Sequence, residues 1–292
     1  MRRGLLIGLL VLVLGGTATA ATGISAGEGQ LNAENYSGAY LLLRQEAADG
    51  NARSQFLLGV MSDNGLGPIA LDPREAARWY RIAAERGSVE AQFRLASAHF
   101  VGRGVAKDKS EAVHWLERAA EQGFTPAMRS LAELYGSGKV AADDPGAAEK
   151  LIARAAQLGD AEAQFTYAGW LETGHGMTPD PSAALTWYRR AADQGHVPAQ
   201  LQLGRSLAGP SAADEQALEG LMWLGVALRA TESKAKDARG KDTKAKDEAV
   251  AIRTQVAAIR KELSARLPPY QIADAEGRAR AWKPEPAATD QR

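Results

Sequence analysis

Histidine is the residue type in this chain best suited to metal binding or acid–base catalysis, and it occurs at His99, His114, His175 and His196. No pair of them has the H-E-x-x-H spacing that places two ring nitrogens on one helix face for zinc. The chain also contains no cysteine, which excludes thiolate zinc sites, iron–sulfur clusters and a cysteine nucleophile. We therefore predict no metal site and no cofactor.

Two short serine motifs resemble pieces of a serine hydrolase. Ser62-Asp63-Asn64 spells S-D-N, and Ser233 with Lys236 spells S-x-x-K. Serine β-lactamases carry S-x-x-K first, then S-D-N, then K-T-G. Here the order is reversed, K-T-G is missing, and no G-x-S-x-G or P-loop motif occurs. We therefore predict no catalytic residues.

The N-terminus has the composition of a secretion signal. Arg2 and Arg3 precede an apolar stretch, Leu5–Leu14, and the small residues Ala18–Ala20 follow it. The stretch is too short to span a membrane, so we expect a signal peptide over residues 1–20, cut after Ala20. The mature protein would then be periplasmic or secreted. Residues 21–35 are predicted to form a flexible leader.

The overall composition is that of a globular protein. Of the 292 residues, 45% are hydrophobic and 24% are charged, with 35 Lys+Arg against 35 Asp+Glu. This balance argues against a nucleic-acid partner, because nucleic-acid-binding domains usually carry a basic excess. No second long apolar run follows the N-terminus, so no membrane span is expected after cleavage.

A 36-residue repeat organises the middle of the chain. The periodic glycines are Gly87, Gly123, Gly159 and Gly195, each preceded by a pair of alanines. The tryptophan column is Trp79, Trp115, Trp187 and Trp223, with Leu151 in the remaining position. One helix pair cannot bury its apolar face alone, so such repeats stack. We predict an all-α, right-handed α-solenoid of about five two-helix repeats over residues 36–230, with a helical C-terminal cap.

Each repeat is predicted to contain a helix A and a helix B. In one copy, helix A spans Val89–Val101 and ends at the glycines Gly102 and Gly104. Helix B then begins with an aspartate as its N-cap and ends at the periodic glycine. The predicted caps are Asp72, Asp108, Asp144 and Asp180. Glu75 and Glu111 could close capping boxes with the first two.

The repeat pattern A-x-x-x-L-G-x-x-Y-x-x-G-x-G-V-x-x-D-x-x-x-A-x-x-W-Y-x-x-A-A-x-x-G resembles the SEL-1-like repeat, a relative of the tetratricopeptide repeat. The match is clearest at Ala91–Gly123 and Ala163–Gly195 and good at Asn51–Gly87. Thr125–Gly159 is degenerate and Val197–Arg229 is weaker. The resemblance implies an α-solenoid that binds proteins or peptides, often in the bacterial envelope. It does not identify the partner.

The C-terminal part differs in composition from the repeats. Residues 231–247 are predicted to form a charged low-complexity linker, residues 248–283 the capping helices, and residues 284–292 a disordered tail. One apolar face of the first capping helix would be formed by Val250, Ile252, Val256, Ile259 and Leu263.

Helix A lines the concave surface of tetratricopeptide-like arrays, so its outward positions are candidates for partner binding. These positions are Glu90, Arg94, Ser97, Arg129, Glu133, Thr166, Gln202 and Arg205. They could equally be solvated helix faces. We expect a non-enzymatic scaffold or adaptor of the periplasm or cell envelope that binds a protein or peptide, with regulation of an envelope sensor or an assembly machine as the role considered. The alternatives are an envelope hydrolase acting on cell-wall or β-lactam substrates and a structural spacer without a specific partner.

Overall fold

The structure, a computed structural model, describes residues 25–141, 144, 146–176, 178–209, 212–237 and 243–285. The predicted signal peptide, residues 1–20, lies outside the described residues. Across the described part of the chain, all regular secondary structure is α-helical, in 14 helices. The chain divides into two compact units, residues 1–151 and residues 152–292, which are described separately below.

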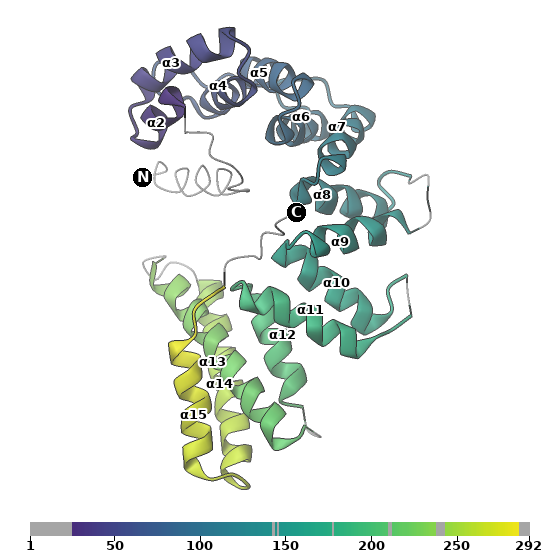
Figure 1. The fold of residues 1–292 in the computed structure, drawn as a ribbon, viewed down its shortest axis with the longest axis vertical. Helices are drawn as coiled ribbons and strands as arrows, with labels where there is room; N and C mark the ends of the chain where they lie inside the picture. The colour runs from purple at the N-terminus through teal and green to yellow at the C-terminus, as the bar shows by residue number, and fades with distance from the viewer. Residues whose placement is uncertain are drawn as a thin grey trace. The chain divides into compact units, whose positions relative to one another are not determined.

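Unit 1 consists of paired antiparallel helices that follow one another in chain order (Figure 1). Its helices are α2 (Ala26–Asn32), α3 (Tyr36–Ala48), α4 (Ala52–Asn64), α5 (Pro73–Glu85), α6 (Val89–Val101), α7 (Lys109–Glu121), α8 (Thr125–Gly136) and the beginning of α9 (Ala147–Gln157). We call the pair α4–α5 repeat 1, α6–α7 repeat 2 and α8–α9 repeat 3. Helix A of repeat 2 spans Val89–Val101, as the sequence predicts.

Unit 2 continues with the same pairing and ends in two additional helices (Figure 1). Its helices are the rest of α9, α10 (Ala161–Thr173), α11 (Pro181–Asp193), α12 (Val197–Leu207), α13 (Asp214–Asp237), α14 (Thr243–Ser264) and α15 (Pro269–Ala281). Repeat 4 is α10–α11 and repeat 5 is α12–α13. The helices α14 and α15 pack on α13, and the rings of Trp223 and Trp282 meet edge to face at 5.8 Å.

The aspartate N-caps of helix B are confirmed in three repeats. The side chains of Asp72, Asp108 and Asp180 accept backbone N–H groups of the first turn. The predicted capping boxes do not form. The backbone N–H of Asp72 donates to the Ser62 carbonyl at 2.9 Å, and that of Asp108 donates to the His99 carbonyl at 2.9 Å. The caps therefore tie helix B to the end of helix A, which leaves no free N–H for the glutamate of a capping box.

The periodic glycines end helix B in a left-handed conformation that a side chain would strain. Their φ angles are 91° at Gly87, 87° at Gly123, 90° at Gly159 and 89° at Gly195. The following residue donates to the first alanine of the preceding pair, as Ser88 does to Ala83 at 3.0 Å. This is the hydrogen bond of a Schellman motif. The two alanines before each glycine are buried in the core, where a small side chain is needed.

Part of the predicted flexible leader, residues 21–35, is helical instead. In α2, Leu31 is buried and Ser25 caps the helix. Glu46 on α3 accepts hydrogen bonds from Ser25 and from the N–H of Gly27. Burial alone would raise the pKa of Glu46, but its hydrogen bonds from Ser54, Gly27 and Ser25 lower it below the ordinary value. The described part of this segment, residues 25–35, is thus held in place by contacts with residues distant in the sequence.

The predicted linker, residues 231–247, also differs from expectation over its described residues. Residues 231–237 extend α13, and residues 243–247 begin α14. Thr231, Ala235 and Ala245 are buried, and α13 packs against α14. On the predicted apolar face of α14, Ile252 and Leu263 are buried, whereas Val250 is exposed and does not belong to that face. No helix among the described residues is both long and apolar enough to cross a membrane.

Candidate functional site

Three residue columns meet where one repeat joins the next. The first is a position near the end of helix A, the second is the position after the tryptophan column in helix B, and the third lies in helix A of the next repeat. At the junction of repeats 1 and 2, these positions hold Asp63, Tyr80 and Arg94. At the junction of repeats 2 and 3, they hold Phe100, Leu116 and Ser130.

The first junction forms a polar pocket of about 100 Å³ between α4, α5 and α6. Arg103 lies at its edge, with Nη2 2.8 Å from Oδ1 of Asp63. Burial, followed by the negative charge of Asp63 and a hydrogen bond to it, raises the pKa of the Tyr80 hydroxyl. The hydroxyl therefore stays protonated and donates to the carboxylate.

Arg94 is the charged group of this pocket that lacks a partner. Its side chain is half-buried, and among the described residues it has no hydrogen bond or ion pair. The pocket contains the two guanidinium groups of Arg94 and Arg103 against the single carboxylate of Asp63. It therefore carries one excess positive charge. An arginine in such a place suits a planar anion such as a carboxylate, which it can bind with two parallel hydrogen bonds.

Glycines allow the close packing that shapes the polar pocket. Gly104 has a φ of 75°, and a Cβ there would lie 2.0 Å from the Pro73 carbonyl oxygen. Because Gly104 has no Cβ, the loop that carries Arg103 can lie directly against the beginning of α5. A Cβ at Gly59 would lie 2.6 Å from the ring of Tyr80. The tyrosine ring therefore occupies the space that the missing side chain leaves.

The second junction forms an apolar pocket of about 190 Å³ between α6, α7 and α8. Its walls include the apolar side chains of Phe93, Ala96, Phe100, Leu116 and Leu134. The charged residues at this pocket are Glu133 and Lys139, whose charged atoms lie 3.9 Å apart. Ser97 lines both this pocket and the polar pocket, so the two are neighbours across α6.

In unit 2, the junction of repeats 4 and 5 holds Glu172, Tyr188 and Gln202 at the three columns. The Tyr188 hydroxyl donates to Glu172 Oε2 at 2.8 Å, and Gln202 Nε2 donates to the same carboxylate at 3.3 Å. Burial and then the hydrogen bond to Glu172 raise the pKa of Tyr188. At this junction the residue at the third position, Gln202, donates a hydrogen bond to Glu172, whereas Arg94 at the first junction makes no such bond.

The predicted groove residues fall into different environments. In unit 1, Arg94, Ser97 and Glu133 line the two pockets. Glu90 is instead engaged by Arg53 at 3.1 Å, in an ion pair between helices A. Arg129 is half-buried on α8.

The remaining three predicted groove residues lie in unit 2. Thr166 donates to the Glu162 carbonyl of its own helix at 2.9 Å. Gln202 bonds to Glu172, and Arg205 Nε donates to Gln255 on α14 at 3.2 Å. These side chains are satisfied within unit 2.

A column of buried glutamines in helix A escaped the sequence analysis. Its members are Gln55, Gln92, Gln164 and Gln200, and each donates to an alanine carbonyl eight residues earlier. Three acceptors, such as Ala84 for Gln92 at 3.1 Å, belong to the alanine pairs that end helix B, and the fourth, Ala47, lies near the end of α3. The column could have been found, because it follows the repeat period with only position 128 departing from it, as Met128.

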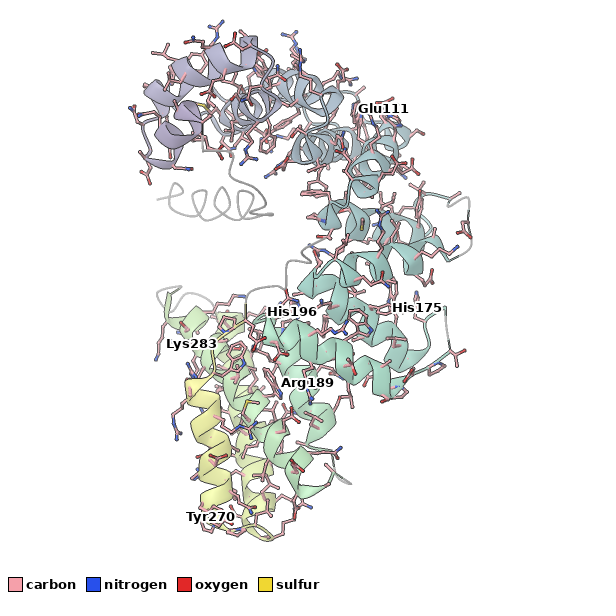
Figure 2. All side chains as sticks on the ribbon, in the orientation of Figure 1. Glu111, His175, Arg189, His196, Tyr270 and Lys283 are labelled. Carbon is pink, nitrogen blue, oxygen red and sulfur yellow. The ribbon has the colours of Figure 1, made fainter. Side chains whose placement is uncertain are left out.

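The four histidines lie on separate elements and have separate contacts. Arg81 donates to His99 Nε2 at 3.1 Å, and His114 packs against Trp115. His175 stacks on Trp170 in the loop after α10, whereas His196 caps α12 through Nδ1 (Figure 2). In the part of the chain that the structure describes, no three His, Asp or Glu side chains are grouped to hold a metal ion.

The S-D-N residues have structural contacts at the end of α4. The buried Ser62 hydroxyl donates to the Leu58 carbonyl at 3.0 Å, and Asn64 Nδ2 donates to the Val60 carbonyl at 2.8 Å. Ser233 is exposed on α13. Two members of the tryptophan column, Trp115 and Trp223, are buried in the core and donate to Glu111 and Glu219 of their own helices. The other two, Trp79 and Trp187, are half-buried.

The stacked helix pairs and their junctions define a helical repeat scaffold. The Sel1 repeat family model matches residues 52–88, 89–124, 125–160 and 161–196, and the chain belongs to this family. A Sel1 repeat protein from Oxalobacter formigenes is 27% identical, with a TM-score of 0.65, over 88% of this chain and 98% of that one. A protective antigen present in uropathogenic Escherichia coli strains, which displays an SLR fold, is also 27% identical. Its TM-score is 0.56, over 91% of this chain and 58% of that one. No curated protein sequence matches the chain.

Proposed function

We propose that the protein is a non-enzymatic scaffold of the bacterial cell envelope that binds a partner protein on the helix A face of unit 1. The observation that carries this proposal is the pair of neighbouring pockets across α6, which share Ser97. Concave sites with apolar walls and a few polar groups are where proteins usually bind their ligands. The predicted groove residues Arg94 and Glu133 lie in the same two pockets.

The envelope location rests on the N-terminal sequence. Arg2 and Arg3, the apolar stretch and Ala18–Ala20 support a cleaved signal peptide, and with it a location in the periplasm or outside the cell. Family membership supports a scaffold, because a stack of repeats presents an extended surface built from equivalent positions. N-terminal sequencing of the protein from a periplasmic fraction tests the location. A chain beginning at Ala21 supports it, and a cytoplasmic chain that retains residues 1–20 contradicts it.

The partner-binding proposal is tested by photocrosslinking in living cells. A photoreactive phenylalanine analogue is placed at Ser97 in one variant and at Arg78, on the exposed face of α5, in a control variant. We expect one dominant crosslinked protein from position 97, identified by mass spectrometry, and none from position 78. The absence of a product specific to position 97 would overturn the proposal.

A further inference from the structure

We infer that unit 1 recognises an extended peptide segment that carries a bulky apolar side chain and, about two to three residues away, a carboxylate. This inference rests on the proposed function and adds the chemistry of the partner. It is built from the contents of the two pockets and from the distance between them.

The apolar pocket selects one end of the segment. It measures about 190 Å³, and its walls include Phe93, Phe100 and Leu134. An apolar cavity of about 150 Å³ accepts a benzene ring, so a pocket of this size accepts an aromatic or large aliphatic side chain. The charges at its edge, Glu133 and Lys139, are paired with each other and leave the pocket without a net charge.

The polar pocket selects the other end. Asp63 is already satisfied by Tyr80 and Arg103, whereas the half-buried Arg94 makes no hydrogen bond or ion pair with the described residues and acts on the Tyr80 hydroxyl only through its charge. A half-buried arginine is stabilised when a carboxylate replaces the water it would otherwise bind. The excess positive charge therefore fits an aspartate, a glutamate or a C-terminal carboxylate of the partner.

The spacing follows from the helix packing. One pocket lies between α4 and α6 and the next between α6 and α8, so their centres are separated by about one interhelical distance. Packed helices lie about 8–10 Å apart. An extended chain advances about 3.3–3.6 Å per residue. The two recognised groups are therefore about two to three residues apart. Ser97 lines both pockets and would lie under the segment between them.

The test begins with a library of random 12-residue peptides displayed on phage and selected on the purified full chain. We expect enriched sequences with a bulky apolar residue and an acid at about this spacing. One enriched peptide is then labelled with fluorescein and titrated by anisotropy against the native chain, Arg94→Gln and the control Arg78→Gln. Two altered peptides, acid to amide and apolar residue to alanine, complete the set, and circular dichroism verifies that each variant is folded.

The inference predicts that Arg94→Gln weakens binding by about tenfold to a hundredfold, because a hydrogen-bonded charge pair is lost. The amide peptide should bind the native chain as weakly, and Arg94→Gln should weaken the amide peptide no further, which identifies the two groups as partners. Arg78→Gln should bind like the native chain. Enriched peptides without an acid, or peptides insensitive to Arg94→Gln, would overturn the inference, as would a selection that enriches nothing.

The two proposals can fail separately. A cellular crosslink at position 97 without the peptide preference would leave the scaffold function standing and overturn the recognition chemistry. Peptide binding through Arg94 without a cellular crosslink would support the chemistry of the pocket and overturn the proposed function.

Discussion

The first junction of unit 1 and the last junction of unit 2 place the same kinds of side chain at the same repeat positions, with a different result. Both have an acid at the end of helix A and a buried tyrosine that donates to it, Asp63 with Tyr80 and Glu172 with Tyr188. The third position is Arg94 in unit 1 and Gln202 in unit 2.

The difference shows how a repeat fold acquires a site without changing its framework. Gln202 donates to Glu172 and completes an internal network. In unit 1, Arg103 neutralises Asp63 from the loop, so Arg94 stays available for a ligand. Family membership accounts for the framework. The side chain at the third position and the side chain in the loop after helix A together decide whether the third position pairs with the acid or stays available for a ligand.

Removing either tyrosine should break its junction most strongly. Tyr80→Ala and Tyr188→Ala should each lower the free energy of unfolding by about 3–5 kcal/mol, because both rings are buried and leave a cavity. Urea denaturation followed by circular dichroism measures this. Tyr270→Ala is the control, because that side chain is exposed on α15 (Figure 2), and it should change stability by less than about 0.5 kcal/mol. Equal effects at buried and exposed tyrosines would contradict the packing described here.

Replacing Arg94 with the residue found at the unit 2 junction should lower partner affinity without lowering the free energy of unfolding. Arg94→Gln places the residue of the unit 2 junction in unit 1, where it can donate to Asp63 as Gln202 does to Glu172. We expect partner or peptide affinity to fall about tenfold to a hundredfold, which is about 1.4–2.8 kcal/mol, with a stability change below about 0.5 kcal/mol. Parallel anisotropy and urea titrations measure the two effects. A loss of stability as large as the loss of binding would show that Arg94 is structural.

High pH should weaken both junctions through their tyrosines. The pKa values of Tyr80 and Tyr188 are raised in the folded state, first by burial and then by the neighbouring acid. Their contribution to stability is therefore present below about pH 10, the ordinary tyrosine pKa, and is lost as the pH rises above it. Urea denaturation from pH 8 to pH 11 should show a falling free energy of unfolding above about pH 10. Tyr188→Phe should reduce this fall, and an unchanged pH profile in that variant would contradict the assignment.

The smallest effect is expected at the edge of the polar pocket. Arg103 is half exposed, so Arg103→Ala should lower the free energy of unfolding by no more than about 1 kcal/mol. The ion pair should also weaken in high salt in the native chain and not in the variant. Thermal unfolding of both chains at low and high salt measures this. A loss of several kcal/mol would mean that the ion pair supports the junction more than its exposure allows.

The sequence predicts the repeat framework well because its signals are local. Asp72, Asp108 and Asp180 cap helix B through groups two or three residues away, and the periodic glycines need only their own left-handed backbone. Three other features depend on contacts with residues distant in the sequence: helix α2, the end of α13 and the beginning of α14. Glu46 on α3 accepts a hydrogen bond from Gly27 of α2, and α13 packs against α14, with Ala235 and Ala245 buried. Periodicity alone does not reveal such contacts.

The candidate site could be predicted only in part. The sequence places Arg94, Ser97 and Glu133 on outward positions of helix A, but it does not show which of the eight predicted residues stay unpaired. Glu90 and Arg205 are engaged by Arg53 and Gln255, which lie 37 and 50 residues away. One sequence signal could have pointed to the junctions. Only repeats 1 and 4 have both an acid near the end of helix A and a tyrosine after the tryptophan position of helix B, and these repeats form the two junctions compared here.

The measurement that tests the central claim most directly is photocrosslinking in living cells from two equivalent helix A positions, Ser97 in unit 1 and Arg205 in unit 2. The same photoreactive analogue is placed at each, and the crosslinked product is quantified with and without Arg94→Gln. A unit 1 junction in which Arg94 stays available for a ligand predicts a dominant product at position 97 that Arg94→Gln removes, and none at position 205. A product at position 205 alone, or one at position 97 that Arg94→Gln leaves unchanged, would contradict the account.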